Sequence, residues 1–303
     1  AGLGTRLAPL TDYCAKPAVP FLGVPVVRTL VEQLRAAGFD RIVANLHHRP
    51  ASVRAALAGL PVDFSPEDPV LGTAGGLGRA IERGLLRGDA PVLVVNGKIH
   101  TDLDFASVFR AHVTSDTAVS MVLLPNRERA AFREVYVERS RVVGFGEGRE
   151  PQGRDPLLFC GVHVLSPPVL ARLEPAPSDT VADVYPALIA RGAVRADVRE
   201  ARWWELSTPE RYLGLHVRAR RLGLPEHGAS ARIAVDARVD DSVVWDGAEV
   251  GPGATLDRCI VLPGARVPEG AHASCAVLEQ SATADGLRRH ALDPSLVARA
   301  AGS

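Results

Sequence analysis

The sequence lacks an excess of charge of either sign. Its 303 residues contain 35 Lys and Arg and 35 Asp and Glu, so the formal net charge at pH 7 is +0. Proteins that bind nucleic acid usually carry a basic excess, and this balance gives no reason to expect nucleic acid as a partner. Phosphorylated small molecules remain open as ligands, because a local pocket needs only a few cations.

Long apolar runs are missing as well. No run is long enough to cross a membrane, and no segment has the basic start and long apolar centre of a secretory signal. The four cysteines, Cys14, Cys160, Cys259 and Cys275, form no CxxC pair and have no histidine at zinc-binding spacing. We therefore expect a cytoplasmic protein with reduced, buried thiols and without a membrane partner.

The sequence does contain the pattern of an α/β domain. Short β-rich runs alternate with helical patterns, and residues 26–38 (VVRTLVEQLRAAG) predict a helix closed by Gly38. Strands are predicted at 41–46, 91–96, 118–124 and 158–165, and a hairpin at 135–137 and 142–145. This order predicts a Rossmann-like, mostly parallel sheet with helices on both faces, in which 91–96 (PVLVVN) is buried on both faces.

Beyond residue 225 the pattern changes. Val244, Val250, Leu256 and Leu262 fall at every sixth position, and glycines mark turns among them. This is the hexapeptide signature of a parallel β-helix, in which one aliphatic side chain per side points inward and stacks on its equivalent in the next coil. We therefore predict a first domain at 1–225 and a short left-handed β-helix with a C-terminal tail at 226–303.

The end of such a short β-helix needs a cover. Its last coil would expose backbone groups and aliphatic side chains. The segment 284–301 has helical character and is one candidate lid, but it is alanine-rich and interrupted by Pro294. We expect instead that a partner covers this end, so that the protein is a homo-oligomer or part of a complex.

A glycine-rich turn at the start of the chain has the features of a phosphate site. In AGLGTRLAPLT, Gly2 and Gly4 let the backbone approach a phosphate closely, so that amide N–H groups cradle its oxygens. Arg6 can clamp two oxygens at once, and Lys16 is a point charge on a proline-bearing turn. The chain opens inside this motif, and we expect a few residues to precede it.

Further motifs follow this turn in order. KPAVPFLGVPVV begins at Lys16, LGTAGGL occupies 71–77, VVNGKIHTDLD occupies 94–104, FCGVHVLSP occupies 159–167 and WWELSTPERYL occupies 203–213. Together they resemble the sugar-phosphate nucleotidyltransferases, also called NDP-sugar pyrophosphorylases, which include guanylyltransferases acting on mannose 1-phosphate. The resemblance implies a protein that joins a nucleoside triphosphate and a sugar 1-phosphate to give NDP-sugar and pyrophosphate. It leaves the base and the sugar open.

The resemblance implies a role for each matching residue. Arg6 would hold the leaving pyrophosphate, and Lys16 would contact the α-phosphate and the incoming sugar phosphate. The nucleotide-binding residues would be Gly2, Leu3, Gly4, Thr5, Gly72, Gly75, Gly76 and Asn96. The sugar-binding residues would be Glu147 and Gly161.

The sequence departs from the family at its metal site. The family binds Mg²⁺ through the aspartate of an Asn-Gly-Asp turn, but here the turn ends in Lys98, and Glu205 replaces the aspartate that is the second ligand. A protonated lysine repels Mg²⁺, whereas glutamate can ligate it. In one arrangement Glu205 holds the metal with Asp102 or Asp104.

In the other arrangement the Lys98 ammonium takes the place of the metal and pairs with Glu205. This second arrangement predicts a different function. The protein would then be a regulatory pseudoenzyme that binds a nucleotide or NDP-sugar, in complex with an active paralogue, because a shared fold does not fix a shared activity. Its nucleotide affinity would not depend on Mg²⁺.

Overall fold

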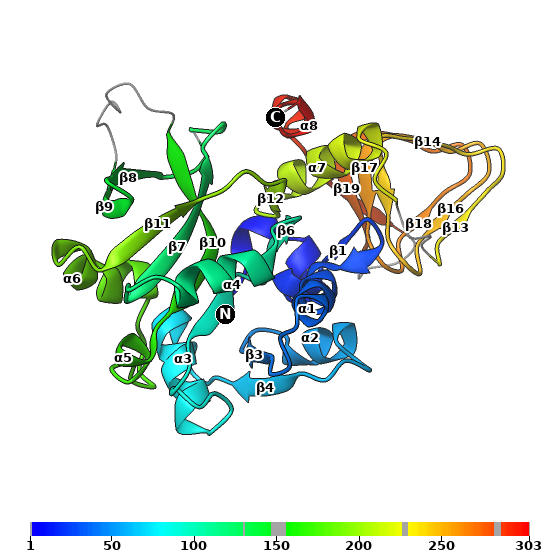
Figure 1. Cartoon of the computed structure of the whole chain (residues 1–303). Coiled ribbons are helices and arrows are strands. Elements are labelled where there is room, and N and C mark those ends of the chain that lie inside the picture. Colours follow the sequence, from blue (N-terminus) through cyan, green and yellow to red (C-terminus); the bar gives the residue numbers. More distant parts are fainter. Residues whose placement is uncertain (1, 130, 147–155, 226–229, 282–285, 303) are drawn as a thin grey trace. The chain divides into compact units, whose positions relative to one another are not determined.

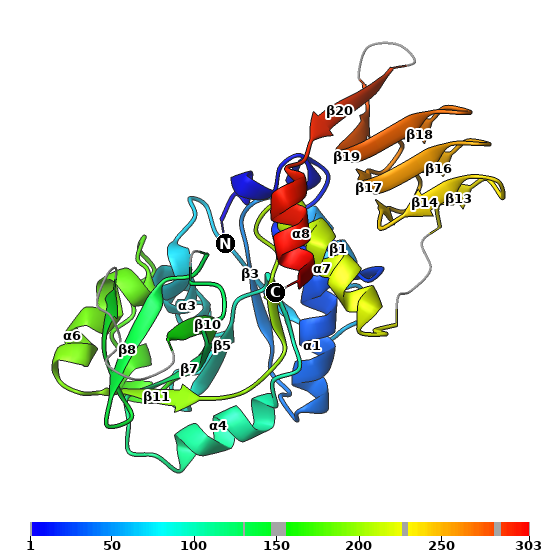
Figure 2. The ribbon, with the colours of Figure 1, turned by 90° about the horizontal axis from the view of Figure 1, so that it is seen from above.

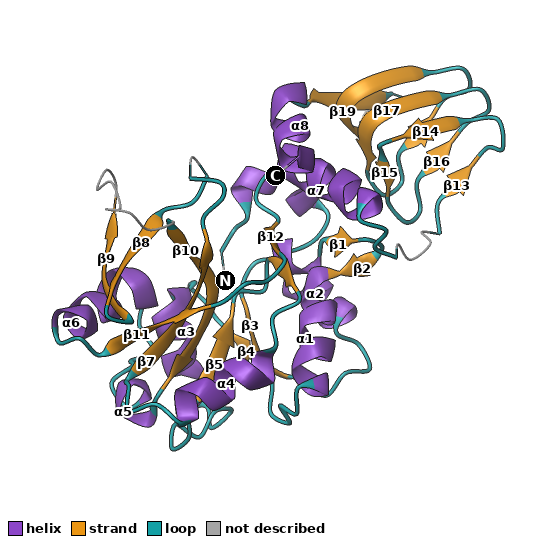
Figure 3. Cartoon of the chain, turned by 45° about the horizontal axis from the view of Figure 1, so that its top comes forward, coloured by secondary structure: helices purple, strands orange, loops and turns teal. Residues whose placement is uncertain are grey.

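The computed structural model describes residues 2–129, 131–146, 156–225, 230–281 and 286–302. The chain divides into two compact units, which we describe separately. We call them the sheet unit (Ala1–Leu3 and Thr29–Trp204) and the tail unit (Gly4–Arg28 and Glu205–Ser303). Figure 1 labels their elements, and Figure 3 colours them by type. Among the described residues, no helix has the length and apolar character needed to pass through a bilayer.

A six-stranded sheet forms the centre of the sheet unit. In spatial order its strands are β5 (Val92–Val95), β10 (Leu157–Leu165), β7 (Val119–Pro125), β11 (Val194–Val198), β9 (Arg141–Gly146) and β8 (Glu134–Glu138). β7 and β11 are parallel, but β10 runs antiparallel to both β5 and β7, and β8 and β9 form the predicted hairpin. The prediction of a mostly parallel sheet is therefore wrong. An apolar run indicates burial, but the direction of a strand follows from its connections, which such a run does not encode.

Helices cover both faces of this sheet, as predicted. Side chains of α3 (Gly72–Glu82), α5 (Pro167–Leu170) and α6 (Tyr185–Ala190) pack on one face against the buried residues Val119, Met121, Leu123, Leu165 and Val194. α4 (Phe105–Val113) lies on the other face (Figure 2). One core layer of this unit therefore lies between the sheet and α3, α5 and α6, and Phe105 and Val108 of α4 are buried as well.

A cavity of about 1190 Å³ lies beside β5. Its lining includes residues 92–95 of β5, Ile42 and Val43 at the start of β3 (Val43–Leu46), and Phe109 of α4. Within the described residues, β3 pairs with β4 (Asp63–Pro66) and not with β5. The residues of β5 are only half-buried. The prediction that this strand is buried on both faces is therefore wrong, because the cavity leaves it without packing partners on one side.

Two further features match the sequence motifs. The helix predicted at 26–38 is confirmed as α1 (Val26–Ala36), and Gly38 follows it with φ +89°. α2 (Pro50–Ala56) comes after β3 in the chain. β6 (Ile99–Thr101) pairs with β12 (Trp203–Glu205), which brings the NGKIHTD motif beside Trp203 and Trp204.

The tail unit begins with short 3₁₀ turns and a small hairpin. The turns are η1 (Thr5–Leu7), η2 (Leu10–Asp12) and η3 (Lys16–Ala18), and the hairpin is β1 (Pro20–Phe21) with β2 (Val24–Pro25). The later part of the unit starts with α7 (Pro209–Arg221), where the Thr208 side chain accepts a hydrogen bond from the Arg211 N–H and caps the helix. Most residues of α7 are buried.

Short strands after residue 230 stack in parallel, each beside the strand one coil later. They are β13 (Arg232–Ile233), β14 (Arg238–Asp240), β15 (Val243–Val244), β16 (Glu249–Val250), β17 (Thr255–Val261), β18 (Arg266–Val267) and β19 (His272–Gln280). Ile233 lies beside Val250, which lies beside Val267. β14, β17 and β19 repeat this offset, and Figure 2 shows the strands stacked side by side. Val250 and Leu256 are buried inside the stack, as the six-residue period predicts.

The end of the tail, where we considered the segment 284–301 as a candidate helical lid, is helical only in part. β20 (Leu287–Ala291) is a strand antiparallel to β19, and the helix α8 covers only Pro294–Gly302. α8 packs on α7 at Gly214, where a Cβ would lie 2.5 Å from the Val297 carbonyl oxygen. β20 fills the edge of β19, so part of the open end from which we predicted association with a partner is covered within the chain, whereas β18 is the end strand of its sheet among the described strands.

Candidate active site

The glycine-rich loop, which we define as residues 4–16, is built around Gly4. This residue has φ +71°, and a Cβ on it would lie 3.1 Å from Thr11 Cγ2 and 3.3 Å from Lys16 Cβ. Its carbonyl accepts hydrogen bonds from the Leu7 N–H (2.9 Å) and the Thr11 hydroxyl (3.2 Å). Leu7 and Leu10 anchor the loop because both are fully buried. The structure thus packs the stem of Lys16 against Gly4, where glycine alone fits without strain.

The neighbours of Gly4 are accessible to a ligand. Thr5 and Arg6 are exposed in η1, and Gly2 and Leu3 are exposed at the start of the chain, in the sheet unit. Exposed N–H groups and a guanidinium suit an anionic ligand. The phosphate contacts of these four residues stay predictions.

The glycines of α3 leave room for neighbouring protein atoms. A Cβ on Gly72 would lie 2.5 Å from the Ser178 carbonyl oxygen, and a Cβ on Gly75 would overlap the backbone at Ala176. A Cβ on Gly76 would lie 2.6 Å from Oε1 of Glu67. Each residue therefore has a packing reason to be glycine, besides the predicted contact with base and ribose.

Glu67 is a buried carboxylate that sequence reasoning missed. It is 5% exposed, and it accepts hydrogen bonds from Asn45 Nδ2 (2.8 Å) and the Leu71 N–H (3.1 Å). These bonds fix the loop that leads into α3 and so the position of the predicted nucleotide-binding glycines. No motif or spacing distinguishes Glu67 from the other acidic residues of the chain.

Asn96 and Gly161 lie against each other. The Asn96 N–H donates to the Gly161 carbonyl at 2.9 Å. Gly161 has φ +80° where the register between β10 and β7 shifts, and a Cβ on it would lie 2.9 Å from Asn96 Cβ. Trp203 joins them, because its Nε1 donates to the Cys160 carbonyl at 2.9 Å. The structure thus brings together a predicted nucleotide-binding residue, a predicted sugar-binding residue and the closing motif.

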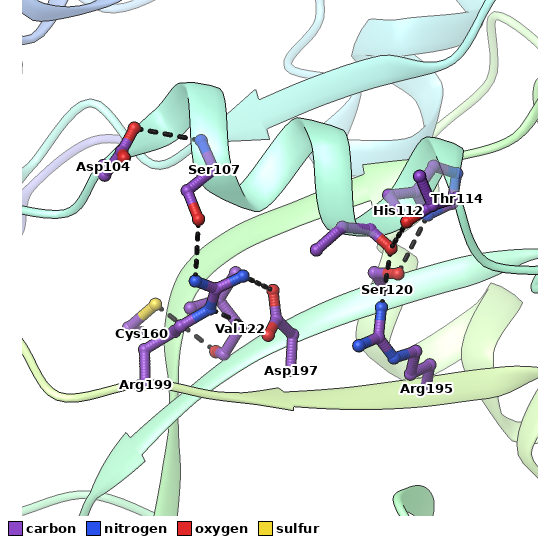
Figure 4. Close-up of polar contacts among 11 residues, drawn as sticks. Asp104, Ser107, His112, Thr114, Ser120, Val122, Cys160, Arg195, Asp197 and Arg199 are labelled. Carbon is purple, nitrogen blue, oxygen red and sulfur yellow. Dashed lines mark hydrogen bonds and ion pairs between the residues drawn. The ribbon is translucent and has the colours of Figure 1, made fainter.

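Lys98 lies half-buried in the turn between β5 and β6. The acidic residues after it have structural roles of their own. Asp102 accepts a hydrogen bond from the Arg202 N–H (2.7 Å) and pairs with its guanidinium (3.6 Å). Asp104 caps α4 by accepting from the Ser107 N–H at 2.9 Å (Figure 4). These roles do not favour either aspartate as the metal ligand that one arrangement assigned to it.

Of the two remaining predicted site residues, Glu205 and Glu147, the structure describes only Glu205. Glu205 ends β12 and is 7% exposed, and its backbone carbonyl accepts from Arg211 Nε at 2.9 Å. Glu147 lies outside the described residues. In the part of the chain that the structure describes, three or more His, Cys, Asp or Glu side chains nowhere gather as metal ligands.

His100 is a second residue that sequence reasoning missed. Its ring stacks on Trp204 with centroids 5.7 Å apart, and the Arg202 guanidinium lies over the same indole at 5.6 Å. Burial, and then the charge of Arg202, lower the pKa of His100 to about 4. The imidazole is therefore neutral at pH 7 and adds no positive charge near Lys98.

The sequence matches a known family over most of its length. A family model described as nucleotidyl transferase matches residues 1–219. The chain belongs to this family. A mannose-1-phosphate guanylyltransferase of Mycobacterium tuberculosis is 30% identical over 290 residues, which cover 89% of the chain and 80% of that relative. A mannose-1-phosphate guanyltransferase of Schizosaccharomyces pombe is 30% identical over 263 residues, 80% of the chain and 70% of the relative. The family resemblance of the motifs is confirmed.

The family typically uses a divalent metal such as Mg²⁺. Mg²⁺ needs oxygen ligands, and proteins usually supply one or two carboxylates while substrate phosphates and water complete the shell. Here a lysine stands in the family's metal turn, and Asp102 and Asp104 are engaged elsewhere. Of the carboxylates proposed as ligands, Glu205 remains, and one carboxylate together with a lysine in the metal turn does not reproduce the family's pair of aspartates.

Proposed function

We propose that this chain joins a nucleoside triphosphate to a sugar 1-phosphate and releases pyrophosphate, with GTP and mannose 1-phosphate as the substrates. The observation that carries the proposal is the similarity to mannose-1-phosphate guanylyltransferases, which extends over 89% of the chain for the Mycobacterium tuberculosis relative. A relative from Oryza sativa subsp. japonica, named a probable mannose-1-phosphate guanylyltransferase, is 26% identical over 91% of the chain and 83% of its own length. These relatives favour a transferase over a regulatory protein that only binds nucleotides.

In the proposed reaction an oxygen of the sugar phosphate attacks the α-phosphorus of the triphosphate. A new phosphorus–oxygen bond forms, the bond to the oxygen bridging the β-phosphate breaks, and pyrophosphate leaves with the electron pair. Negative charge grows on the leaving group, so cations fixed around it accelerate the step. We assign this role to Arg6, whose guanidinium can donate two parallel hydrogen bonds. Lys16, packed against Gly4, would hold the α-phosphate.

The scarcity of lysine supports a role for both lysines of the chain. Lys and Arg together number 35, and only Lys16 and Lys98 are lysines. Arginine supplies the positive charge at every other basic position except the histidines. The general preference of this chain for arginine therefore does not explain why these two motif positions are lysine. A lysine ammonium that binds a phosphate as a compact point charge would explain it.

Lys98 would contact a phosphate oxygen directly. Its ammonium carries the same net charge that an aspartate and a bound Mg²⁺ carry together, and it needs no carboxylate to hold it in place. Its turn directly follows Asn96, which lies against Gly161. This placement supports a phosphate contact near the predicted nucleotide and sugar residues, without a metal as the bridge.

Other features stay proposals. We propose that the stacked strands form a left-handed parallel β-helix, and that this β-helix with its C-terminal tail is a domain at 226–303 after a first domain at 1–225. We also propose a cytoplasmic location and assembly with a second copy or an active paralogue. The pairing of β20 with β19 weakens one physical reason for such assembly, because the edge of β19 already has a partner.

Pyrophosphate release from the native-length protein tests the proposed function. The assay pairs GTP, ATP, UTP or dTTP with mannose 1-phosphate or glucose 1-phosphate, with and without Mg²⁺. We expect release with GTP and mannose 1-phosphate, and its loss in Lys16→Gln. A matched control is Arg83→Gln, which removes an exposed positive charge after α3. If no pair of substrates releases pyrophosphate, the proposed function is wrong.

A further inference from the structure

Glu279, near the end of β19, connects the C-terminal part of the tail unit to the glycine-rich loop in the N-terminal part of the same unit. It is 9% exposed although it carries a carboxylate. Two side chains of β20 contact this carboxylate. Arg288 Nη1 lies 3.3 Å and His290 Nε2 lies 2.9 Å from Glu279 Oε1. The strand register explains this for Arg288, which lies directly opposite Glu279. The side chain of Tyr13, from the glycine-rich loop, lies close enough to the same carboxylate that Glu279, after burial, raises the pKa of Tyr13.

Tyr13 is well placed to control the shape of that loop. It directly follows η2 and caps it, because its N–H donates to the Leu10 carbonyl at 3.2 Å. It lies between Thr11, which bonds the Gly4 carbonyl, and Lys16, whose stem packs on Gly4. The loop consists of short 3₁₀ turns, whose own hydrogen bonds span few residues, so ties from outside must hold it. Burial first, and then the charge of Glu279, raise the pKa of Tyr13, which keeps its hydroxyl protonated beside the carboxylate.

A second tie joins the same parts of the tail unit through α7. The Tyr212 hydroxyl donates to the Pro20 carbonyl at 2.8 Å, and Trp245 Nε1 donates to the Tyr212 oxygen at 2.9 Å. Tyr212 is fully buried and Trp245 is 5% exposed. Pro20 follows the loop closely in the chain, so residues from the C-terminal part of the unit contact the chain at Tyr13 and again just beyond Lys16.

We propose that the C-terminal part of the tail unit (residues 205–303) holds the glycine-rich loop in its phosphate-binding shape. In this proposal Glu279 is a positioning residue that acts through Tyr13. The consequence for turnover rests on the proposed function, but the effect on the loop does not. A tail that was predicted as a separate repeat domain thereby becomes part of the machinery that positions Gly4 and Lys16. Loss of the Tyr13–Glu279 contact would leave the fold intact and loosen the loop.

Hydrogen exchange of the native-length protein tests the proposal. The reporters are the amides of Leu7, Ala8 and Asp12, which are hydrogen-bonded inside the loop. Tyr13→Phe removes only the hydroxyl, and Glu279→Gln removes only the charge. We expect each to speed exchange in the loop by about tenfold or more, the size expected for losing a polar interaction with a charged group. The double variant should be no faster than the stronger single variant, because both remove one interaction.

The matched control is Glu249→Gln. Glu249 is also a tail carboxylate, and Arg232 and Arg266 pair with it inside the tail. Its loss should leave exchange in the loop at the wild-type rate. Unchanged loop exchange in both Tyr13→Phe and Glu279→Gln would overturn the proposal. Faster exchange in Glu279→Gln alone would also overturn it, because the effect would not run through Tyr13.

Steady-state kinetics then separate this inference from the proposed function. If the chain is a nucleotidyltransferase, Tyr13→Phe should raise the KM for the triphosphate several-fold more than it lowers kcat, because the loop must order on binding. Faster loop exchange in a protein that makes no product would support the inference and contradict the proposed function. Normal KM and kcat with a loosened loop would contradict the positioning role.

Discussion

Replacement of Gly161 by alanine should destabilise the sheet unit at the predicted sugar-binding strand. Gly161 has φ +80°, and the left-handed region costs a non-glycine residue about 1–2 kcal/mol. The new methyl group would overlap the Asn96 amide and lie 2.9 Å from Asn96 Cβ. Crowding of this kind typically costs about 1–3 kcal/mol. The free energy of unfolding in urea should therefore fall by about 2–5 kcal/mol, the sum of these two effects.

Gly192→Ala is the matched control for this prediction. Gly192 also has positive φ (+64°) but no other atom within 4 Å of the position of a Cβ. It should lose only about 1–2 kcal/mol, the cost of the backbone conformation. Tryptophan fluorescence can follow both variants, because Trp203 bonds the carbonyl next to Gly161. Equal losses in the two variants would refute the reasoning, since the contact with Asn96 would then contribute nothing.

Three further predictions follow from single contacts and charges. Gly214→Ala should lower the melting temperature and speed hydrogen exchange in α8, because its Cβ would lie 2.5 Å from the Val297 carbonyl oxygen; unchanged exchange would contradict that packing. Burial lowers the pKa of His163 to about 4, below its usual value of about 6.5, so the unfolded chain takes up the proton first. Stability should be full above about pH 6.5 and fall toward pH 4; urea unfolding at several pH values checks this, and a flat profile would refute it. Lys98→Asp should make pyrophosphate release depend on Mg²⁺ more strongly than in the wild type, and equal sensitivity to a chelator would argue against Lys98 as the substitute cation.

Local features of the fold could be predicted where the residues that determine the structure all lie within one short segment. The amphipathic pattern of α1 and its closing Gly38 are such a case, because periodicity and a positive-φ glycine act within the same few residues. The inward aliphatics Val250 and Leu256 are another, since each coil repeats the same environment. In both cases the sequence alone indicated which side chains are buried.

Features that depend on a distant partner could not be predicted. The direction of β10 is set by its connections, and its apolar run reads the same in either direction. The segment Leu287–Ala291 has helical character in isolation, yet it forms β20, whose Arg288 and His290 reach Glu279. A cross-strand ion pair of this kind overrides a weak local preference.

The candidate site shows the same division. The motifs located Gly4, Lys16, Asn96 and Gly161, and the structure places Gly4 against Lys16 and Asn96 against Gly161. Glu67 escaped notice because its role depends on hydrogen bonds to Asn45 and Leu71, which are not adjacent to it in the sequence. Asp104 was a candidate metal ligand by position, but it serves as a helix cap.

Transfer of a labelled phosphorus tests the proposed function most directly. The native-length protein is mixed with mannose 1-phosphate and GTP labelled at the α-phosphorus, and the products are separated. Attack at the α-phosphorus predicts that the label appears in GDP-mannose while unlabelled pyrophosphate forms in equal amount, and that Lys16→Gln abolishes both. Label that stays in GTP, or that appears only in GMP, would contradict nucleotidyl transfer by this chain.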